Sequence, residues 1–175
     1  RGLVGSEMCI RDSPYIELPK KLTVKQNLIV FGKLYKIKNL NDRIDYLTSK
    51  LRLSDILNRI TGELSSGQKN RASLAKSLIN DPKVLLLDEP TASLDPEIGD
   101  FIRSFLEDYK KEKKISILLA SHNMNEVNRL CKSILMMKDG IIVDSGSPAS
   151  VIEKHGRKNL EEVFLKLSRR PNEHN

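Results

Sequence analysis

Long hydrophobic runs are missing from this sequence of 175 residues. Its longest apolar stretches, such as VLLL at 84–87 and ILLA at 117–120, are far shorter than the roughly 20 residues of a membrane-spanning helix. We therefore expect a chain that does not cross a membrane by itself. With 39% hydrophobic and 30% charged residues, the composition is typical of a soluble globular domain with a real core.

Cysteine is also scarce. The two cysteines, Cys9 and Cys131, show neither the spacing of a metal site nor a pairing pattern, which argues against a disulfide scaffold or a zinc module. A reduced, cytoplasmic setting is the resulting expectation.

Aromatic residues make up only 5% of the chain, although its net charge is +7. Such a charge is compatible with a lysine-rich solvated surface, an anionic ligand, nucleic acid or a lipid surface. The lysines are scattered, as in KKEKK at 110–114, and few aromatic residues lie between them. Clustered basic residues with aromatic side chains between them are typical of proteins that bind single-stranded nucleic acid, so this pattern weakens a nucleic-acid function.

The sequence begins RGLVGSEMCIRDS, without an initiator methionine and without the charged-then-apolar pattern of a signal peptide. The string SEMCIRDS resembles translated sequencing adapter. We expect residues 1–13 to be non-native and the native chain to have been cut there, with an ordinary flexible N-terminus as the alternative. No function is assigned to this segment.

Residues 22–60 show helical periodicity and no strand signal. Thr23 is a suitable N-cap for the first helix, and Asn39 or Asn41 lies near the start of the second. A short third helix is predicted around 56–60. The stripes that support these helices are Val24, Leu28, Phe31 and Tyr35, then Leu40, Ile44, Leu47 and Leu51, then Ile56, Leu57 and Ile60.

After Glu63 the pattern changes to alternating helices and strands. A helix is predicted from about Ser66 to Ile79, ended by Pro82. VLLLDEP and ISILLASH read as strands buried on both faces, with an amphipathic helix between them, and SILMMKDGIIVDSG reads as two strands joined by a tight turn. A further helix precedes that hairpin and another lies in the tail. This alternation predicts an α/β fold with a parallel sheet.

Polar residues follow the two predicted buried strands. Asp88 and Glu89 end the first, and Ser121 and His122 end the second. In nucleotide hydrolysis, one acid holds Mg²⁺ through water, another orients or deprotonates the attacking water, and a histidine can contact the terminal phosphate. Taken singly, an Asp-Glu pair is more often a solvated turn and a lone histidine is more often structural.

The stretch ELSSGQKNRA, residues 63–72, places two serines and a glycine at the start of a predicted helix. A helix start presents unpaired N–H groups and a partial positive charge, which suit an anion. Further along, TASLDP at 91–96 reads as a strand-to-helix loop, in which Ser93 caps a turn and Pro96 is the first helical residue. Asp95 could instead reach across an interface.

Taken together, these residues resemble the ATP-binding cassette (ABC) ATPase family. LSSGQ at 64–68 resembles the signature LSGGQ, with Ser66 replacing the first glycine, and VLLLDEP at 84–90 is similar to Walker B with its catalytic glutamate. SLD at 93–95 resembles the D-loop, and His122 falls where the switch histidine would. LTVKQNL at 22–28 resembles the stretch after the Q-loop, and the tail NLEEVFLKLS is similar to that of exporter subunits.

The resemblance implies a P-loop NTPase-type α/β core with an all-helical subdomain, and ATP with Mg²⁺ as ligands. It implies a pair of ATP-binding subunits arranged head to tail, in which the signature of one covers the γ-phosphate of ATP on the other. The implied roles are metal binding through water for Asp88, catalysis for Glu89 and His122, a link between subunits for Asp95, and nucleotide contacts for Ser65, Ser66, Gly67 and Gln68.

One family motif has no match. A P-loop reads G-x-x-x-x-G-K-[ST], and GELSSGQK at 62–69 fails because Gln68 stands where lysine is required. The Q-loop glutamine has no match either, since Gln26 lies inside LTVKQNL. We expect a missing N-terminal β-subdomain that carried both motifs, so that this chain alone does not bind ATP. The remainder, 14–175, divides into a helical subdomain (14–80), a catalytic core (81–146) and a helical tail (147–175).

The expected function is that of the ATP-binding and ATP-hydrolysing subunit of an ABC transporter, and the exporter-like tail favours an exporter. It would act with a membrane permease at the cytoplasmic face, docking through residues 15–60, with no nucleic acid partner. One alternative is a soluble ABC ATPase that acts on nucleic acid or ribosomes, mildly favoured by the basic charge. Another is a non-enzymatic regulatory cassette, against which the Asp88–Glu89 pair and His122 argue.

Overall fold

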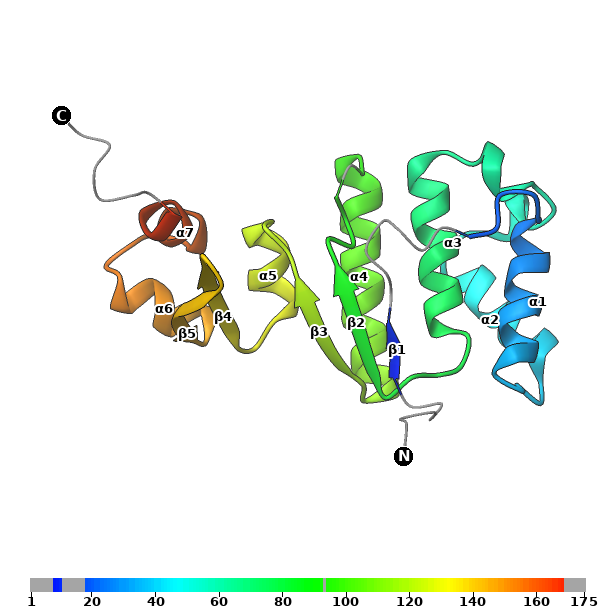
Figure 1. The fold of residues 1–175 in the computed structure, drawn as a ribbon, viewed down its shortest axis with the longest axis horizontal. Helices are drawn as coiled ribbons and strands as arrows, with labels where there is room; N and C mark the ends of the chain where they lie inside the picture. The colour runs from blue at the N-terminus through cyan, green and yellow to red at the C-terminus, as the bar shows by residue number, and fades with distance from the viewer. Residues whose placement is uncertain (1–7, 11–17, 93, 169–175) are drawn as a thin grey trace. The chain divides into compact units, whose positions relative to one another are not determined.

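The computed structural model describes residues 8–10, 18–92 and 94–168 (Figure 1). The chain divides into two compact units, residues 1–120 and 121–175, and each is described by itself. Among the described helices, none combines the length and the apolarity that crossing a membrane requires.

The first unit begins with the helices that the sequence predicts. They are α1 (Val24–Leu34), α2 (Leu40–Lys50), α3 (Ser66–Leu78) and α4 (Pro96–Lys113). Thr23 caps α1 as predicted, because its side chain accepts a hydrogen bond from the N–H of Gln26 while the Gln26 side chain accepts from the N–H of Thr23. This reciprocal capping box satisfies two donors at the helix start.

The third helix predicted around 56–60 is wrong. The structure has only a 3₁₀ turn at η1 (Ser54–Ile56), and a second at η2 (Thr61–Glu63). The carbonyl groups of Leu57 and Arg59 accept hydrogen bonds from the first N–H groups of α1, at 2.9 and 3.1 Å. Those carbonyls are therefore unavailable for a local helix, and the chain pairs at Ile60 with Thr23 in an isolated bridge.

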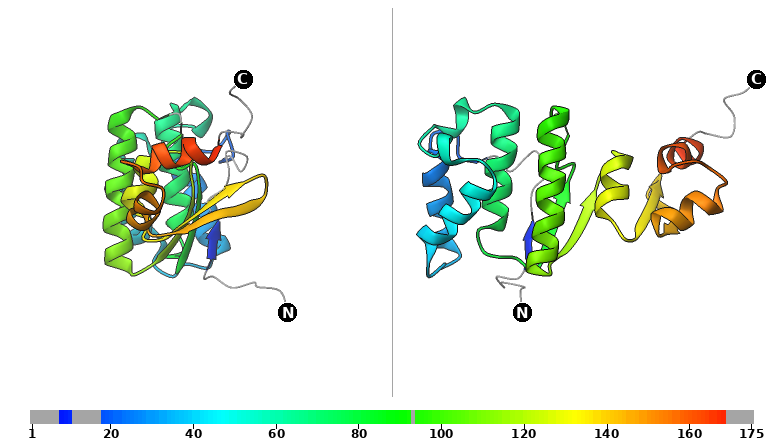
Figure 2. Two further views of the ribbon diagram at one scale, coloured as in Figure 1. Left: turned by 90° about the vertical axis from the view of Figure 1, so that its left-hand side faces the viewer. Right: turned by 180° about the vertical axis from the view of Figure 1, so that it is seen from behind.

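A three-stranded parallel sheet forms the centre of the first unit, in the order β1 (Met8–Ile10), β2 (Val84–Asp88), β3 (Ser116–Ala120). The predicted parallel α/β architecture is thus confirmed. The segment for which the sequence predicted a non-native origin includes β1, a short strand of this sheet. α4 lies against one face of the sheet (Figure 2), and it buries Ile102, Phe105, Leu106 and Tyr109.

The strands β2 and β3 differ in burial. The expectation that both strands are buried on both faces is therefore wrong. Leu85 and Leu87 of β2 are buried, whereas Leu118 of β3 is 65% exposed. Among the described strands, β3 pairs only with β2. The residues on the Leu118 face of β3 are exposed, and those on its other face are half-buried. The hydrophobic run alone could not distinguish a central strand from an edge strand.

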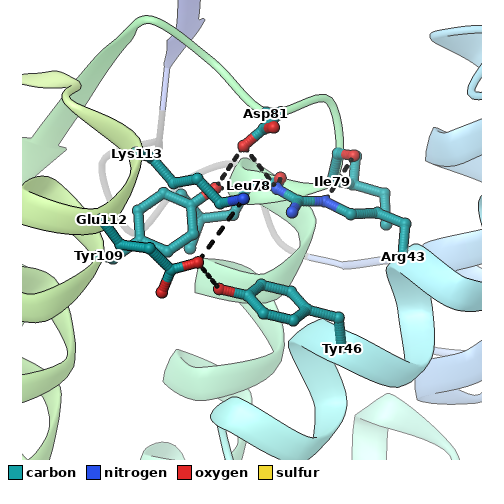
Figure 3. Close-up of polar contacts among 8 residues, drawn as sticks. All are labelled: Arg43, Tyr46, Leu78, Ile79, Asp81, Tyr109, Glu112 and Lys113. Atoms are coloured by element: carbon teal, nitrogen blue, oxygen red, sulfur yellow. Dashed lines mark hydrogen bonds and ion pairs between the residues drawn. The ribbon is translucent and has the colours of Figure 1, made fainter.

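A polar network joins three helices of the first unit (Figure 3). The guanidinium of Arg43 on α2 donates to the carbonyls of Leu78 and Ile79 at the end of α3, and to the hydroxyl of Tyr109 on α4 at 2.8 Å. Tyr109 in turn donates to Asp81 at 2.9 Å. Arg43 therefore satisfies carbonyls that the end of a helix leaves without partners, while it connects α2 to α4.

The second unit contains α5 (Met124–Leu130), the antiparallel hairpin β4 (Ile134–Lys138) and β5 (Ile141–Gly146), α6 (Pro148–Lys154) and α7 (Leu160–Ser168). The predicted tight turn is confirmed: Asp139 and Gly140 both have positive φ, 50° and 77°, as a two-residue hairpin of this kind needs. The buried cluster of this unit consists of Ile134, Met136, Val151, Leu160 and Val163.

Candidate functional site

The two acids lie at the carboxyl end of the central strand. Asp88 is the last residue of β2 and pairs with Ala120 of β3. The N–H of Glu89 donates to the carbonyl of Ala120 at 2.8 Å, so the pairing extends one residue beyond the strand. Both carboxylates are therefore held at the edge of a parallel sheet where ligands bind in α/β folds.

Glu89 has a left-handed backbone, with φ of 47°. This conformation is uncommon for a residue with a side chain, and such residues are concentrated at functional sites. It turns the chain away from the sheet directly after Asp88, and the N–H of Ala92 donates back to the carbonyl of Glu89 at 3.1 Å. The Glu89 side chain is half-buried, whereas Asp88 is exposed.

Ser65 and Gln68 build the start of α3. The hydroxyl of Ser65 accepts from the N–H of Gln68 at 3.3 Å, and the side-chain oxygen of Gln68 accepts from the N–H of Ser65 at 3.0 Å. This capping box defines the N-terminal start of α3, with Ser65 as the N-cap residue. By helix geometry, the N–H groups of Ser66 and Gly67 have no intrahelical acceptor, so they are the donors that the helix start offers to an anion.

Among the described residues, no neighbour requires a glycine at position 67. A Cβ atom built on it would lie 3.5 Å from Cγ2 of Ile98, which is ordinary van der Waals contact. The residue is half-buried and helical. A glycine at this position would let a ligand come close to the backbone of the helix start.

The helix start and the two acids are connected through α3. The side-chain amide of Asn70 donates to the carbonyl of Pro90, directly after Glu89, at 2.8 Å. The side chain of Ile98, in the first turn of α4, lies next to Gly67. The first unit thus holds the beginning of α3, the loop after β2 and the start of α4 in one connected region.

Asp95 is the N-cap of α4. Its carboxylate accepts from the N–H of Ile98 at 2.9 Å, and Pro96 follows at the first helical position, as predicted. A cap needs one carboxylate oxygen, and Asp95 is exposed, so the link between subunits that the resemblance implies stays a prediction. Ser93 lies outside the described residues.

His122 belongs to the second unit, two residues beyond the last residue of β3, and its side chain is exposed. The residues on either side of it, Ser121 and Asn123, take part in hydrogen bonds with Glu126 of α5. Sequence reasoning missed Glu126. The available signal was that this acidic residue directly precedes Val127, which belongs to the predicted apolar face of that helix.

The chemistry of the donors fits Mg²⁺ held mainly by water and phosphate. Within the described ranges, no group of three or more His, Cys, Asp or Glu side chains gathers into a metal cage. Mg²⁺ is commonly bound by one or two carboxylates, several waters and the phosphates of its nucleotide. Exposed Asp88 at the sheet edge suits that kind of binding.

Comparisons with known proteins point to one family. The family model described as ABC transporter matches residues 8–92. The chain is 35% identical over 147 residues to the ABC transporter ATP-binding protein NatA of Bacillus subtilis, a match that covers 83% of this chain and 59% of NatA. It is 36% identical over 149 residues to the Nod factor export ATP-binding protein I of Rhizobium sp. strain N33, covering 84% of this chain and 49% of that protein.

A solved structure agrees with these relatives. CbiO1 from Clostridium perfringens, described as part of the ABC transporter complex cbiONQ, superimposes with a TM-score of 0.69 at 29% identity, covering 85% of this chain and 59% of CbiO1. The chain spans about half the length of the curated relatives it matches, 59% of one and 49% of the other. It belongs to the ABC transporter family, and the two curated relatives are named as ATP-binding proteins.

Proposed function

We propose that this chain is the part of an ATP-hydrolysing ABC subunit that carries the signature and the catalytic acids, in a protein that drives export through a separate membrane permease. The observation that carries the proposal is the pairing of Glu89 with Ala120, which fixes two carboxylates at the ligand-binding edge of the sheet. Export is supported by relatives whose names state it.

The two acids divide the chemistry between them. Asp88 would hold Mg²⁺ through water, and the bound ion would supply positive charge beside the phosphates. Glu89 orients the attacking water and accepts its proton as ATP is cleaved to ADP and phosphate. His122 contacts the γ-phosphate as a hydrogen-bond donor. These assignments follow the order of the motifs along the chain and the position of both acids beside β3.

The start of α3 receives the γ-phosphate of ATP that is bound to a second subunit. The N–H groups of Ser66 and Gly67 donate to the phosphate oxygens, and the partial positive charge of the helix start adds to the attraction. Ser65 contributes as well, because a hydroxyl that accepts from Gln68 through a lone pair still donates through its own hydrogen. Gln68 retains its amide donors, and Asp95 links the two subunits.

The partners in this proposal are a second ABC ATP-binding subunit, identical or different, and a transmembrane permease at the cytoplasmic face of the membrane. The helices from residue 15 to 60 dock on the permease, and no nucleic acid partner is involved. Support comes from CbiO1, which is described as part of a transporter complex. The phosphate-binding loop of the site belongs to a longer parent protein, consistent with the greater length of the relatives.

A second candidate is a soluble ABC ATPase that acts on nucleic acid or ribosomes. The observation that favours it is the net charge of +7. A permease gene beside the gene for this protein would decide for transport.

The role of Glu89 is tested in the complete parent protein by Glu89→Gln. The amide keeps the shape of the side chain but cannot accept the proton of water, so we expect ATP turnover to fall by at least about 100-fold. ATP should still drive two subunits together, since the contacts of Ser66 and Gly67 are unchanged. Phosphate release measures turnover, and size-exclusion chromatography with ATP measures pairing.

Glu161→Gln on α7 is the matched control, because Glu161 is exposed and lies outside the site. It should leave both readouts unchanged. Turnover by Glu89→Gln at the rate of the unmodified protein would refute the assigned role of Glu89.

A further inference from the structure

We propose that Glu126 is the positioning residue for His122, acting through the hydroxyl of Ser121. This proposal rests on the proposed function, since it concerns the histidine that contacts phosphate there. All the contacts that carry it lie within the second unit, among Ser121, Asn123 and the first turn of α5.

Four hydrogen bonds hold the short segment around His122. The hydroxyl of Ser121 donates to Oε2 of Glu126 at 2.8 Å and accepts from the N–H of Asn123 at 3.0 Å. The side-chain oxygen of Asn123 accepts from the N–H groups of Asn125 and Glu126, at 3.1 and 3.2 Å. His122 is therefore bracketed by two residues that are each anchored to α5.

The carboxylate of Glu126 orients this network. A hydroxyl rotates freely unless an acceptor fixes its hydrogen, and Oε2 of Glu126 provides that acceptor for Ser121. Once the hydrogen points to Glu126, a lone pair of Ser121 faces the N–H of Asn123. The turn that contains His122 is thus closed by a charge-assisted contact, which is stronger than one between neutral groups.

The cost of burying Glu126 argues against a purely structural role. The residue is fully buried, at 0% exposure, and among the described residues its Oε1 atom has no hydrogen-bond partner. Burying an incompletely paired carboxylate is unfavourable, and an apolar side chain of similar volume would stabilise the same helix position better. Retaining a carboxylate here serves the arrangement of the neighbouring loop.

The first test uses the 175-residue chain itself. Nuclear magnetic resonance reports the ring signals of His122, assigned with His122→Ala, and the hydrogen exchange of the Asn123 amide. In Glu126→Ala, we expect displaced ring signals for His122 and amide exchange at Asn123 that is about tenfold faster or more, as the loss of one protecting contact allows. Glu126→Gln keeps an acceptor for Ser121, so it should restore most of both signals.

Asn128→Ala is the matched control, because Asn128 is exposed on the same helix. It should change neither signal. Ser121→Ala provides a second route to the same loss if Glu126→Ala does not fold. Ring signals and exchange rates that stay unchanged in both Ser121→Ala and a folded Glu126→Ala would overturn the proposal.

The second test measures ATP turnover in the complete parent protein. Misplacing a group in the site by a fraction of an ångström lowers the rate rather than the affinity, so Glu126→Ala should reduce kcat by about 10-fold to 100-fold with KM nearly unchanged. Combined with His122→Ala, it should cause no further loss. Independent, multiplying losses would contradict the link, whereas full activity of His122→Ala alone would refute the role of His122 and leave the resonance test of the loop valid.

Discussion

At the scale of single residues, the site depends on local backbone geometry as much as on side-chain type. Glu89 adopts a left-handed backbone with φ of 47°, and its N–H is held by Ala120. Gly67 leaves the helix start open although a methyl group would fit against Ile98. Packing among the described residues accounts for neither feature, and the proposed nucleotide contacts at the end of the sheet and at the helix start would account for both.

Asp144 provides a residue-scale prediction about acid stability. Its carboxylate is buried, with Nζ of Lys154 at 2.6 Å, Nε2 of His155 at 2.5 Å and the N–H of Ser145 at 2.8 Å. The hydrogen bond from Lys154, followed by those from His155 and Ser145, lowers the pKa of Asp144 from 3.8 to about 2. Because the pKa is lower in the folded state, this stabilisation is complete above 3.8 and is lost as the pH falls toward 2.

We therefore expect the second unit to lose stability between about pH 4 and pH 2, and Asp144→Asn to weaken that dependence while lowering stability at pH 7. Urea unfolding at a series of pH values, followed by the resonances of β4 and β5, measures the effect. Asp108→Asn, at an exposed position of α4, is the control. An unaltered pH dependence in Asp144→Asn would show that other carboxylates govern the acid transition.

At the scale of helices and strands, the Arg43 network connects α2, α3 and α4 (Figure 3). Tyr109 is only 2% exposed, and its hydroxyl accepts from Arg43 and donates to Asp81. Burial raises the pKa of Tyr109, which keeps this hydroxyl protonated and able to donate. The contact between α2 and α4 thus requires the hydroxyl group of a tyrosine, which phenylalanine lacks.

Tyr109→Phe should lower the free energy of unfolding of the first unit by about 1–3 kcal/mol, because it leaves the buried side of the Arg43 guanidinium with one partner fewer. Tyr46→Phe is the matched control. It removes a single solvent-exposed hydrogen bond, to Glu112 at 3.0 Å, so its effect should stay within about 0.5 kcal/mol. Urea unfolding followed by circular dichroism measures the free energy of unfolding of both variants. Equal losses in the two would contradict the larger stabilising role assigned to Tyr109.

The sequence predicted most elements because their signals are local. Thr23 and Gln26 form a capping box three residues apart, and Asp139 with Gly140 forms a turn from adjacent residues. The errors concern long-range contacts: the carbonyls of residues 57 and 59 are taken by α1, and among the described strands β3 has β2 as its only neighbour. Helix α6, seven residues long, was missed despite its Ser147 cap and Pro148, since so short a stretch has little periodicity.

In the candidate site, too, features with a local signal were predicted and features that depend on long-range contacts were not. Asp88, Glu89 and the Ser65–Gln68 helix start were predicted because each is marked by residue type at a fixed place in a strand or helix. The backbone conformation of Glu89, the contact from Asn70 to Pro90 and the network around Glu126 were not predicted. They depend on which elements meet in space, and a pattern along one chain does not contain that information.

At the scale of the whole molecule, the proposed function gives this chain only part of what an ATP site needs. The chain contains the helix start, the two acids and His122, but no sequence of the form G-x-x-x-x-G-K-[ST] that would cradle the β- and γ-phosphates. It spans 59% and 49% of two curated relatives. In this account, ATP binds first to a phosphate loop outside the chain, and the residues described above act when a second subunit closes over it.

The most direct test is a calorimetric titration of ATP with Mg²⁺ into the purified chain, with the complete parent protein measured alongside. The account predicts saturable binding by the parent and no binding tighter than about 1 mM by the chain, because the backbone donors and lysine of a phosphate loop are absent from it. Submillimolar binding by the chain alone would contradict the account.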